Sequence, residues 1–504
     1  MRAFILFAMF PLSFCHPSRH VQKSLGFARD FSEITNLNLR RADIPPPPLK
    51  MDPAFYFTTS VSPFQKSTPG LFMLNLTWNT PERSASTIDD VITLHCSDDA
   101  RKIGDYWSVR ESSGSVSVPL VSGIGCLFEF RYLFGGFSEN AHVVAMTPPL
   151  KLGSDSDPVG TRISFGEDEG TIVFTFSSLT NSSLAEAYVS VGTSSGGPYT
   201  MNFTAEAATT YTASQLCHAP ANISGINSYI FPGYFHTTVL PLSPGTRYYA
   251  VYGHRGSPPA PETTFRTRLV DPSKPTRFAA FGDSALYPVF PGTVTTIDSI
   301  NAVDADVGEV DFTAVIGDLA YAEGSTVLWT LWAAFTFPIA SRIPFLVTVG
   351  NHETNVLSCF SKEPIAHQAL WQGPIPTENA YGDDCGGEGG IPTLVRYRGP
   401  NNGQGTHWYS FNAGNVHFTH FSSEHDYRAG SAQRLWLAAD LASVNRSRTP
   451  WLVVAMHRPM YNSRDDGDWN INMGMRAELE TLFLVSKVDL VLSGPFKTLS
   501  RSLN

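Results

Sequence analysis

The sequence is poor in charged residues. Asp, Glu, Lys and Arg make up 16% of its 504 residues, against a typical share of about 25%. It contains no basic run, and its formal net charge is -10 at pH 7. Proteins that bind nucleic acid without sequence preference neutralise phosphates with clustered Lys and Arg side chains. The composition therefore excludes nucleic-acid binding of that kind.

The sequence also lacks an apolar run long enough to cross a membrane, which takes about 18 residues. The run from Ala3 to Leu12 is shorter. It follows Arg2 and precedes Ser13-Phe14-Cys15, which has small residues at the spacing that signal peptidase requires. A membrane anchor is the alternative, but the run is too short for one. We therefore expect residues 1–15 to be a secretory signal, the protein to be secreted, and no lipid anchor to follow, because the C-terminus has no hydrophobic tail.

Cysteine is scarce, with six residues. One of them, Cys15, falls within the predicted signal, so an odd number remains. Since cysteines of secreted proteins usually form disulfides, we predict that Cys359 pairs with Cys385 and that Cys96 pairs with Cys126. N-linked glycans are expected at five Asn-x-Ser/Thr sequons, which agree with secretion: Asn75, Asn181, Asn202, Asn222 and Asn445.

Turn-forming residues are abundant in the first half of the chain. Residues 16–64 lack periodicity and include four consecutive prolines at 45–48, which predicts a linker or propeptide. Short alternating runs separated by turns over residues 65–153 predict a β-sandwich. Residues 154–272 predict a second sandwich. Its turn at Leu242–Thr246, which leads into the aromatic run Arg247–Gly253, resembles the fibronectin type III fold.

After the boundary at Asp271–Pro275 the pattern changes to alternating strands and helices, which predicts an α/β domain over residues 273–504. Apolar runs covered on both faces are typical of such sheets. We expect helices at 294–305, 325–340, 432–444 and 473–487. We expect strands at 277–281, 314–316, 344–349, 408–411, 416–421, 451–456 and 489–492.

Polar side chains follow these strands in order. The strand ends carry Gly282-Asp283, Gly317-Asp318 with Tyr321, Gly350-Asn351-His352, and Val454 to His457. Taken singly, each fits an ordinary helix cap or a packed aromatic residue better than a site. Taken together, they favour a metal site, because the carboxyl ends of parallel strands collect ligands at one edge of a sheet. The donor types suit two ions, one of them hard.

These segments resemble the purple acid phosphatases of the metallophosphoesterase superfamily, whose blocks are Gly-Asp-x-Gly, Gly-Asp-x-x-Tyr, Gly-Asn-His-Asp/Glu, Val-x-x-His and Gly-His-x-His. Ala285 replaces glycine in the first block; the next three blocks are complete. The segments Cys217–Asn222 and Pro232–His236 are similar to the larger plant-type members, which carry an additional N-terminal β-domain. The resemblance implies a multidomain protein with two N-terminal β-sandwich domains before an α/β metallophosphoesterase domain.

The resemblance also implies the roles of individual residues. Asp283 and Tyr321 would bind Fe(III), Asp318 would bridge two ions, and Asn351 and His457 would bind a divalent Zn, Mn or Fe ion. The pair would bind a phosphate monoester and acidify a water for in-line attack. His352 would bind phosphate or protonate the leaving alcohol.

Further histidines lie nearby in the sequence. His425 follows Glu424, as in related long members, and it is either a substrate contact or an ordinary strand-end histidine. His417 and His420 lie on a strand at odd spacing, so they face opposite sides, and we expect both to be structural.

The fifth block is missing. Pro495-Phe496-Lys497 follows Ser493-Gly494, and no histidine occurs from there to Asn504. Each ion would lose an imidazole, and charged Lys497 cannot replace it. We therefore expect a catalytic domain that is truncated at its C-terminus and weakly active or inactive. A non-catalytic secreted binding protein derived from a phosphatase is the alternative.

Overall fold

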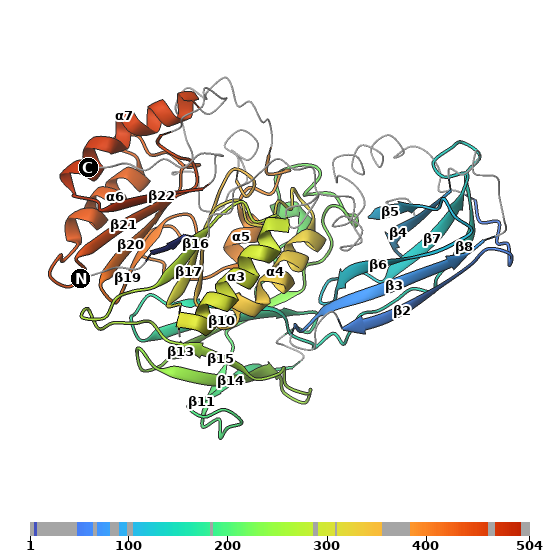
Figure 1. Ribbon diagram of the computed structural model, residues 1–504, viewed down its shortest axis with the longest axis horizontal. Coiled ribbons are helices and arrows are strands. Elements are labelled where there is room, and N and C mark those ends of the chain that lie inside the picture. The colour runs from blue at the N-terminus through green and yellow to red at the C-terminus, as the bar shows by residue number, and fades with distance from the viewer. Residues whose placement is uncertain are drawn as a thin grey trace.

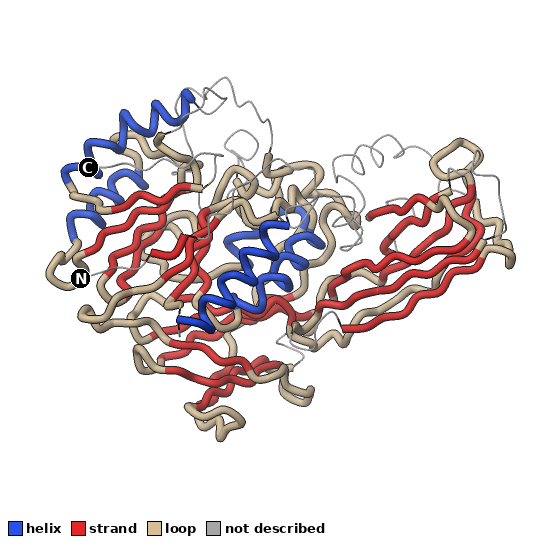
Figure 2. The backbone as a smooth tube through the Cα atoms, viewed as in Figure 1, coloured by secondary structure: helices blue, strands red, loops and turns tan. Residues whose placement is uncertain are grey.

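The structure is a computed structural model. It describes residues 5–7, 48–63, 68–80, 90–97, 104–181, 185–285, 291–307, 310–354, 384–461 and 469–494. Figures 1 and 2 show three units, of which the first, built from strands alone, projects to one side. No helix in these ranges is both long and apolar enough to cross a membrane.

The first unit is a β-sandwich. One sheet has the strand order β2 (Tyr56–Pro63), β3 (Leu71–Asn79) and β6 (Ser113–Val121). The other has the order β5 (Asp105–Ser108), β4 (Val91–Cys96), β7 (Phe128–Phe134) and β8 (His142–Met146). The segment predicted to be a linker or propeptide supplies β2, so that boundary prediction was wrong for residues 56–63. Its backbone hydrogen bonds are satisfied by antiparallel pairing with β3.

The second unit is also a sandwich. One sheet has the order β13 (Tyr234–Pro241), β10 (Thr171–Ser178) and β9 (Val159–Phe165). The other has the order β12 (Met201–Thr204), β11 (Ala187–Gly192), β14 (Arg247–His254) and β15 (Thr263–Arg266). In chain order both sandwiches place strands one, two and five in one sheet and four, three, six and seven in the other. The predicted tandem of β-sandwiches is confirmed, and the fibronectin type III-like order applies to both.

The third unit contains two four-stranded sheets. The first has the order β1 (Ile5–Phe7), β16 (Phe278–Phe281), β17 (Phe312–Ile316) and β18 (Phe345–Thr348), all parallel. The second has the order β19 (Tyr409–Ala413), β20 (Val416–Phe421), β21 (Trp451–Met456) and β22 (Leu490–Ser493). Only the β19–β20 pair is antiparallel. Strand β1 lies within the predicted signal segment, and the signal stays a prediction.

The two sheets pack face to face through aromatic rings. The Phe312 ring centroid lies 5.1 Å from that of Phe411 and 5.4 Å from that of Phe418. Because side chains alternate along a strand, the other face of each sheet needs its own cover. Val315 and Phe345 in the first sheet pack in one hydrophobic cluster with residues of α4. Both faces of each sheet are therefore buried, as the apolar runs predicted.

Within its described residues the third unit has five helices: α3 (Pro291–Val307), α4 (Thr326–Ala340), α5 (Ile391–Arg396), α6 (Ala432–Ser443) and α7 (Trp469–Val485). Helices α6 and α7 cover the second sheet. Ser325 and Ser431 begin α4 and α6 as N-caps, each accepting an N–H from the residue three positions later. The predicted helices all form, with ends that differ by a few residues.

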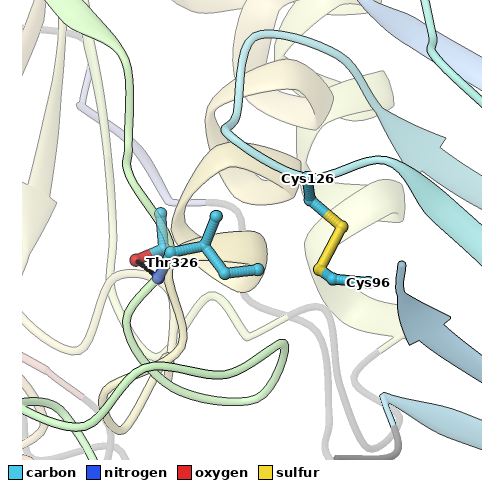
Figure 3. Close-up of a disulfide and its surroundings, with 4 residues drawn as sticks. Cys96, Cys126 and Thr326 are labelled. Atoms are coloured by element: carbon cyan, nitrogen blue, oxygen red, sulfur yellow. Dashed lines mark hydrogen bonds between the residues drawn. A yellow bond between two sulfur atoms is a disulfide. The ribbon is translucent and has the colours of Figure 1, made fainter. Parts of the chain in front are cut away.

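One predicted disulfide is present. Cys96 and Cys126 are bonded in the first sandwich, close to the start of α4, where Thr326 lies (Figure 3). The second predicted disulfide, between Cys359 and Cys385, cannot be compared with the structure because Cys359 lies outside the described residues. Cys217 also forms a disulfide.

The segment 228–231 contacts both the first sandwich and the third unit. Phe231 O accepts from Gly125 N at 2.9 Å, and Ile230 N donates to Thr326 Oγ1 at 3.2 Å.

Candidate metal centre

The predicted ligands converge at the carboxyl ends of the strands. Asp283 follows β16, Asp318 follows β17 and His457 follows β21. Within the ranges that the structure describes, these three form the one group of at least three acidic, His or Cys residues whose ligand atoms all lie within 4.8 Å of one another. Asp318 and His457 are buried, each 3% exposed. The sheet edge therefore assembles the site that the strand pattern predicted.

The backbone at this edge is strained. Among the described residues, five that are not glycine have a positive φ, and four of them belong to the site: Asp283, Asp318, Tyr321 and Glu323. Such a conformation costs of order 1–3 kcal/mol for each residue and persists where the surrounding structure enforces it. Ala285, which replaces a usual glycine, is not among them, so its side chain needs no left-handed backbone. Backbone strain of this kind is typical of functional sites, so it supports a functional role for the loops that follow β16 and β17.

The glycines before the ligands are required by close packing. A Cβ atom on Gly350 would lie 2.2 Å from Asp318 Oδ1. A Cβ on Gly317, whose φ is 72°, would lie 2.8 Å from the His457 ring. These two positions therefore need glycine so that three strand ends can approach each other.

Tyr321 connects the two carboxylates. Its hydroxyl donates to Asp283 Oδ1 at 2.8 Å and lies 2.9 Å from Asp318 Oδ2. Burial, followed by the charges of the two carboxylates, raises the pKa of Tyr321 far above its ordinary value. Burial and the neighbouring Asp318 raise the pKa of Asp283 to about 7. The arrangement concentrates negative charge that a cation would neutralise.

His457 and Asn351 are oriented by partners on their far sides. His457 Nδ1 donates to Ile316 O at 3.0 Å, and Nε2 faces Asn351 Oδ1 at 3.1 Å. Asn351 Nδ2 donates to Asp384 Oδ2 at 3.0 Å, which leaves its carbonyl oxygen for the site. A partner of this kind fixes the orientation of a metal ligand.

Asp318 and His457 form an ion pair at 3.3 Å. Burial opposes both charges, but the attraction of Asp318 raises the pKa of His457 to about 10. In the same way, although burial acts against it, His457 lowers the pKa of Asp318. The two side chains therefore stabilise each other's charges in the absence of a metal ion.

The residues fit a metal ion. Asp283 Oδ2 is buried and has no hydrogen-bond partner in the described part of the chain, and an orphaned carboxylate oxygen is costly unless a cation approaches it. Carboxylate, phenolate and amide oxygens suit hard ions, and imidazole suits divalent transition metals.

Three acidic residues near the centre were not among the predicted site residues. Glu353 is completely buried, and its carboxylate accepts N–H groups from Asp318 at 2.8 Å, Leu319 at 2.8 Å and Gly350 at 2.9 Å. Its place in the Gly-Asn-His-Glu segment was a signal. Glu323 lies two residues after Tyr321 but belongs to no block, and only the tertiary fold brings Asp384 to the site.

His352 lies beside the ligands. Its Nε2 is 4.0 Å from Asp318 Oδ2, its Nδ1 is 3.4 Å from Glu323 Oε1, and its ring is 4.1 Å from that of Tyr321. Against the effect of burial, Glu323 and Asp318 raise the pKa of His352 to about 9. The imidazolium is thus positioned at the edge of the centre.

The other histidines lie in separate environments. His425 is completely buried; its ring lies 4.3 Å from that of His407, and its Nδ1 is 2.7 Å from Ser422 Oγ. Its catalytic role stays a prediction. His417 contacts Asn412 and Asp440, whereas His420 stacks on Tyr409 at 4.9 Å, which agrees with structural roles on opposite faces of β20. The missing fifth block, from Pro495 onward, lies outside the described residues.

Comparison with known proteins identifies the class. Residues 276–494 match the calcineurin-like phosphoesterase family, so the third unit is a metallophosphoesterase domain. The predicted resemblance to purple acid phosphatases is also confirmed: over 306 residues the chain is 32% identical to the Arabidopsis thaliana protein named probable inactive purple acid phosphatase 9. This match covers 56% of this chain and 45% of that protein.

A second Arabidopsis thaliana protein, purple acid phosphatase 22, is 32% identical over 265 residues, which cover 51% of each chain. The chain thus spans about half the length of these curated relatives. The structure of a purple acid phosphatase from yellow lupin (Lupinus luteus) seeds superposes with a TM-score of 0.70 at 24% identity, covering 88% of this chain and 80% of that one. At that identity the likeness shows the shared fold. The family implies a dinuclear metal site and a phosphate ester substrate.

Proposed function

We propose that this protein is a secreted, metal-dependent phosphatase of the purple acid phosphatase type that hydrolyses phosphate monoesters, and that its activity is low because the fifth motif is missing. The observation that carries the proposal is the convergence of Asp283, Tyr321 and Asp318 with Asn351 and His457 at one sheet edge. The family resemblance suggests Fe(III) and divalent Zn, Mn or Fe as the metals to test, and the proposal requires only that the site binds metal.

The side chains support this chemistry in distinct ways. Bound metal ions would supply positive charge to the substrate phosphate and lower the pKa of an attacking water. Asp318 offers carboxylate oxygens to the metal, and Glu353 holds the backbone of Asp318 and Gly350 in place through three N–H groups. The centre is therefore organised before any ligand arrives.

His352 supplies the proton in this proposal. Its Nδ1–H faces the Glu323 carboxylate at 3.4 Å, so its Nε2–H is available to a leaving oxygen. A raised pKa of about 9 keeps the imidazole protonated throughout the acidic range. Protonation of the leaving alcohol by a positioned group typically contributes about 10²–10⁴ in rate.

Secretion and glycosylation belong to the same proposal. The five sequon asparagines are exposed or half-buried, so attached glycans would not disturb the core. Treatment of the protein from a eukaryotic expression host with a glycosidase tests this part: a fall in mass supports it, and an unchanged mass contradicts it.

A non-catalytic binding protein is the second candidate. It is favoured by Pro495 and Lys497, which stand where the family has two histidines, and by relatives named as probable inactive. In that case the two sandwich units would carry the function.

The deciding experiment measures phosphate release from p-nitrophenyl phosphate between pH 4 and 7, after incubation of the purified chain with Fe(III) and Zn(II) or Mn(II). The proposed phosphatase gives slow, metal-dependent turnover that Asp318→Asn abolishes and that Asp271→Asn, at an exposed turn, leaves unchanged. No turnover and no bound metal would contradict the proposed phosphatase and support either the binding-protein alternative or a damaged catalytic domain.

A further inference from the structure

The candidate ligand atoms form one continuous cluster rather than two separate groups. Asp318 Oδ2 lies 2.9 Å from the Tyr321 hydroxyl and 3.3 Å from His457 Nε2. At the outer ends of the cluster, Asp283 Oδ1 lies 2.8 Å from the Tyr321 hydroxyl, and Asn351 Oδ1 lies 3.1 Å from His457 Nε2. Five side chains thus place one atom each within 2.8 to 3.3 Å of the next.

These spacings match the distances between neighbouring ligand atoms of a single ion. Metal–ligand bonds of about 2.1 Å place adjacent ligands about 3 Å apart when they subtend a right angle. Opposite ligands are then about 4.2 Å apart, and the ligand atoms of Asp283, Asp318 and His457 all lie within 4.8 Å of one another. Small side-chain movements would therefore complete one coordination shell.

The number of donors leads to the same conclusion. Pro495 and Lys497 follow Gly494 at the positions of the family's two histidines, and neither a proline side chain nor a charged lysine can coordinate a metal. Two ions would have three protein ligands each, counting Asp318 twice. One ion would have five, which approaches the six that hard divalent ions prefer.

We infer that this site binds one metal ion, to which five side chains each contribute a ligand: Asp283, Asp318, Tyr321, Asn351 and His457. The inference rests on the proposed function only in requiring that the site takes metal. An ion shared by both carboxylates would relieve their crowding around the Tyr321 hydroxyl. One coordination position remains for a phosphate oxygen.

The first test is stoichiometry. The full chain is loaded with Mn(II) alone, freed of excess metal and measured by elemental analysis, with calorimetric titration for the number of binding events. One ion per chain and an isolated six-line Mn(II) spectrum by electron paramagnetic resonance are expected. Two ions with a coupled spectrum would overturn the inference and leave the proposed function standing, whereas no bound ion would overturn both.

Two variants distinguish one shared ion from two separate ions, and the use of two variants keeps the test valid if one of them fails to fold. If all donors share one ion, Tyr321→Phe and Asn351→Ala each weaken the same single binding event, by at least the 10- to 100-fold that loss of a supporting partner costs. If there are two ions, each variant removes one event and leaves the other unchanged. A residual event with unaltered affinity would therefore refute the inference. Asp271→Asn, in an exposed turn, serves as the matched control and retains full binding.

A gain of binding provides the complementary test. The double substitution Pro495→His and Lys497→His restores the spacing of the family's fifth block. We expect metal content to rise from one ion to two per chain. If the parent chain already binds two ions, the double variant will show no increase, which would contradict the inference.

Discussion

Glu353 holds the backbone of Asp318, the residue at the centre of the candidate metal site. The Glu353 carboxylate accepts the Asp318 N–H at 2.8 Å and is fully buried. Burial, with Asp318 as the second cause, raises the pKa of Glu353 to about 8. The last residue of the Gly-Asn-His-Glu segment is therefore a positioning residue.

Replacing this carboxylate should loosen the centre. Glu353→Gln substitutes an amide N–H for an oxygen that accepts backbone N–H groups, so at least one donor is left unsatisfied. We expect a loss of about 1–3 kcal/mol in unfolding free energy together with weaker Mn(II) binding. Urea denaturation and calorimetric titration measure the two effects.

The matched control for that substitution is Glu262→Gln. Glu262 also accepts from three donors, Ser195 Oγ at 2.7 Å, Gly196 N at 2.8 Å and the Tyr199 hydroxyl, but it is exposed in the second sandwich. We expect a small stability change and unaltered metal affinity. Equal effects of both variants on metal binding would show that Glu353 does not position the centre.

Substitution of His352 should separate catalysis from metal binding. Because His352 is assigned a proton and no metal, His352→Asn should lower turnover of p-nitrophenyl phosphate by about 10²–10⁴ while metal content stays constant. Glu323→Gln removes only the group that faces Nδ1 and should have a smaller effect. Turnover of His352→Asn equal to that of the parent would contradict the role.

The same assay tests His425. If it contacts substrate, His425→Asn raises KM with little change in kcat. If its role is confined to packing against His407, the variant loses stability and keeps its KM.

Buried histidines should make the fold sensitive to acid. Burial lowers the pKa of His407 to about 4 and that of His420 to about 3, below the ordinary value of about 6.5. The unfolded chain therefore binds protons that the folded chain does not, and stability that is complete above about pH 6.5 is lost as pH falls toward the folded values. Each such group contributes a slope of about 1.4 kcal/mol per pH unit.

His420→Phe tests this slope. The phenyl ring replaces an imidazole that stacks on Tyr409, so packing is retained while one titrating group disappears. Urea unfolding at pH 7, 6 and 5 should show a slope reduced by about 1.4 kcal/mol per unit. Phe418→Leu, a neighbour in the same contact, should lower stability equally at every pH. Identical slopes for parent and His420→Phe would refute the prediction.

The disulfide between Cys96 and Cys126 should stabilise the first sandwich. It closes a loop with a sequence separation of 30 residues, for which chain entropy predicts about 3–4 kcal/mol. The double variant Cys96→Ser and Cys126→Ser should unfold at correspondingly lower urea concentration without a change in metal content. If the double variant lost metal but kept its stability, the prediction that this disulfide stabilises the first sandwich without affecting the metal site would be wrong.

The sequence by itself determined the order of the units and which candidate ligands follow the strands. Gly-Asp and Gly-Asn pairs after apolar strands predicted a shared sheet edge, because parallel strands end on the same side. The alternating runs after residue 65 predicted sandwiches, but they missed β2, since a strand that follows a proline-rich stretch has no periodic neighbours to mark it.

Only the tertiary structure decided how the ligands are supported and spaced. Glu323 lies just beyond the Gly-Asp-x-x-Tyr block, and Asp384 comes from a loop whose sequence carries no motif. Their contacts with His352 and Asn351 exist because separate strand ends meet. The same is true of the two facing sheets, since strand patterns fix which residues are buried but not which sheet covers them. Likewise, Asp283, Asp318 and Tyr321 have left-handed backbone, which the sequence did not predict at these positions because most aspartate and tyrosine residues have negative φ.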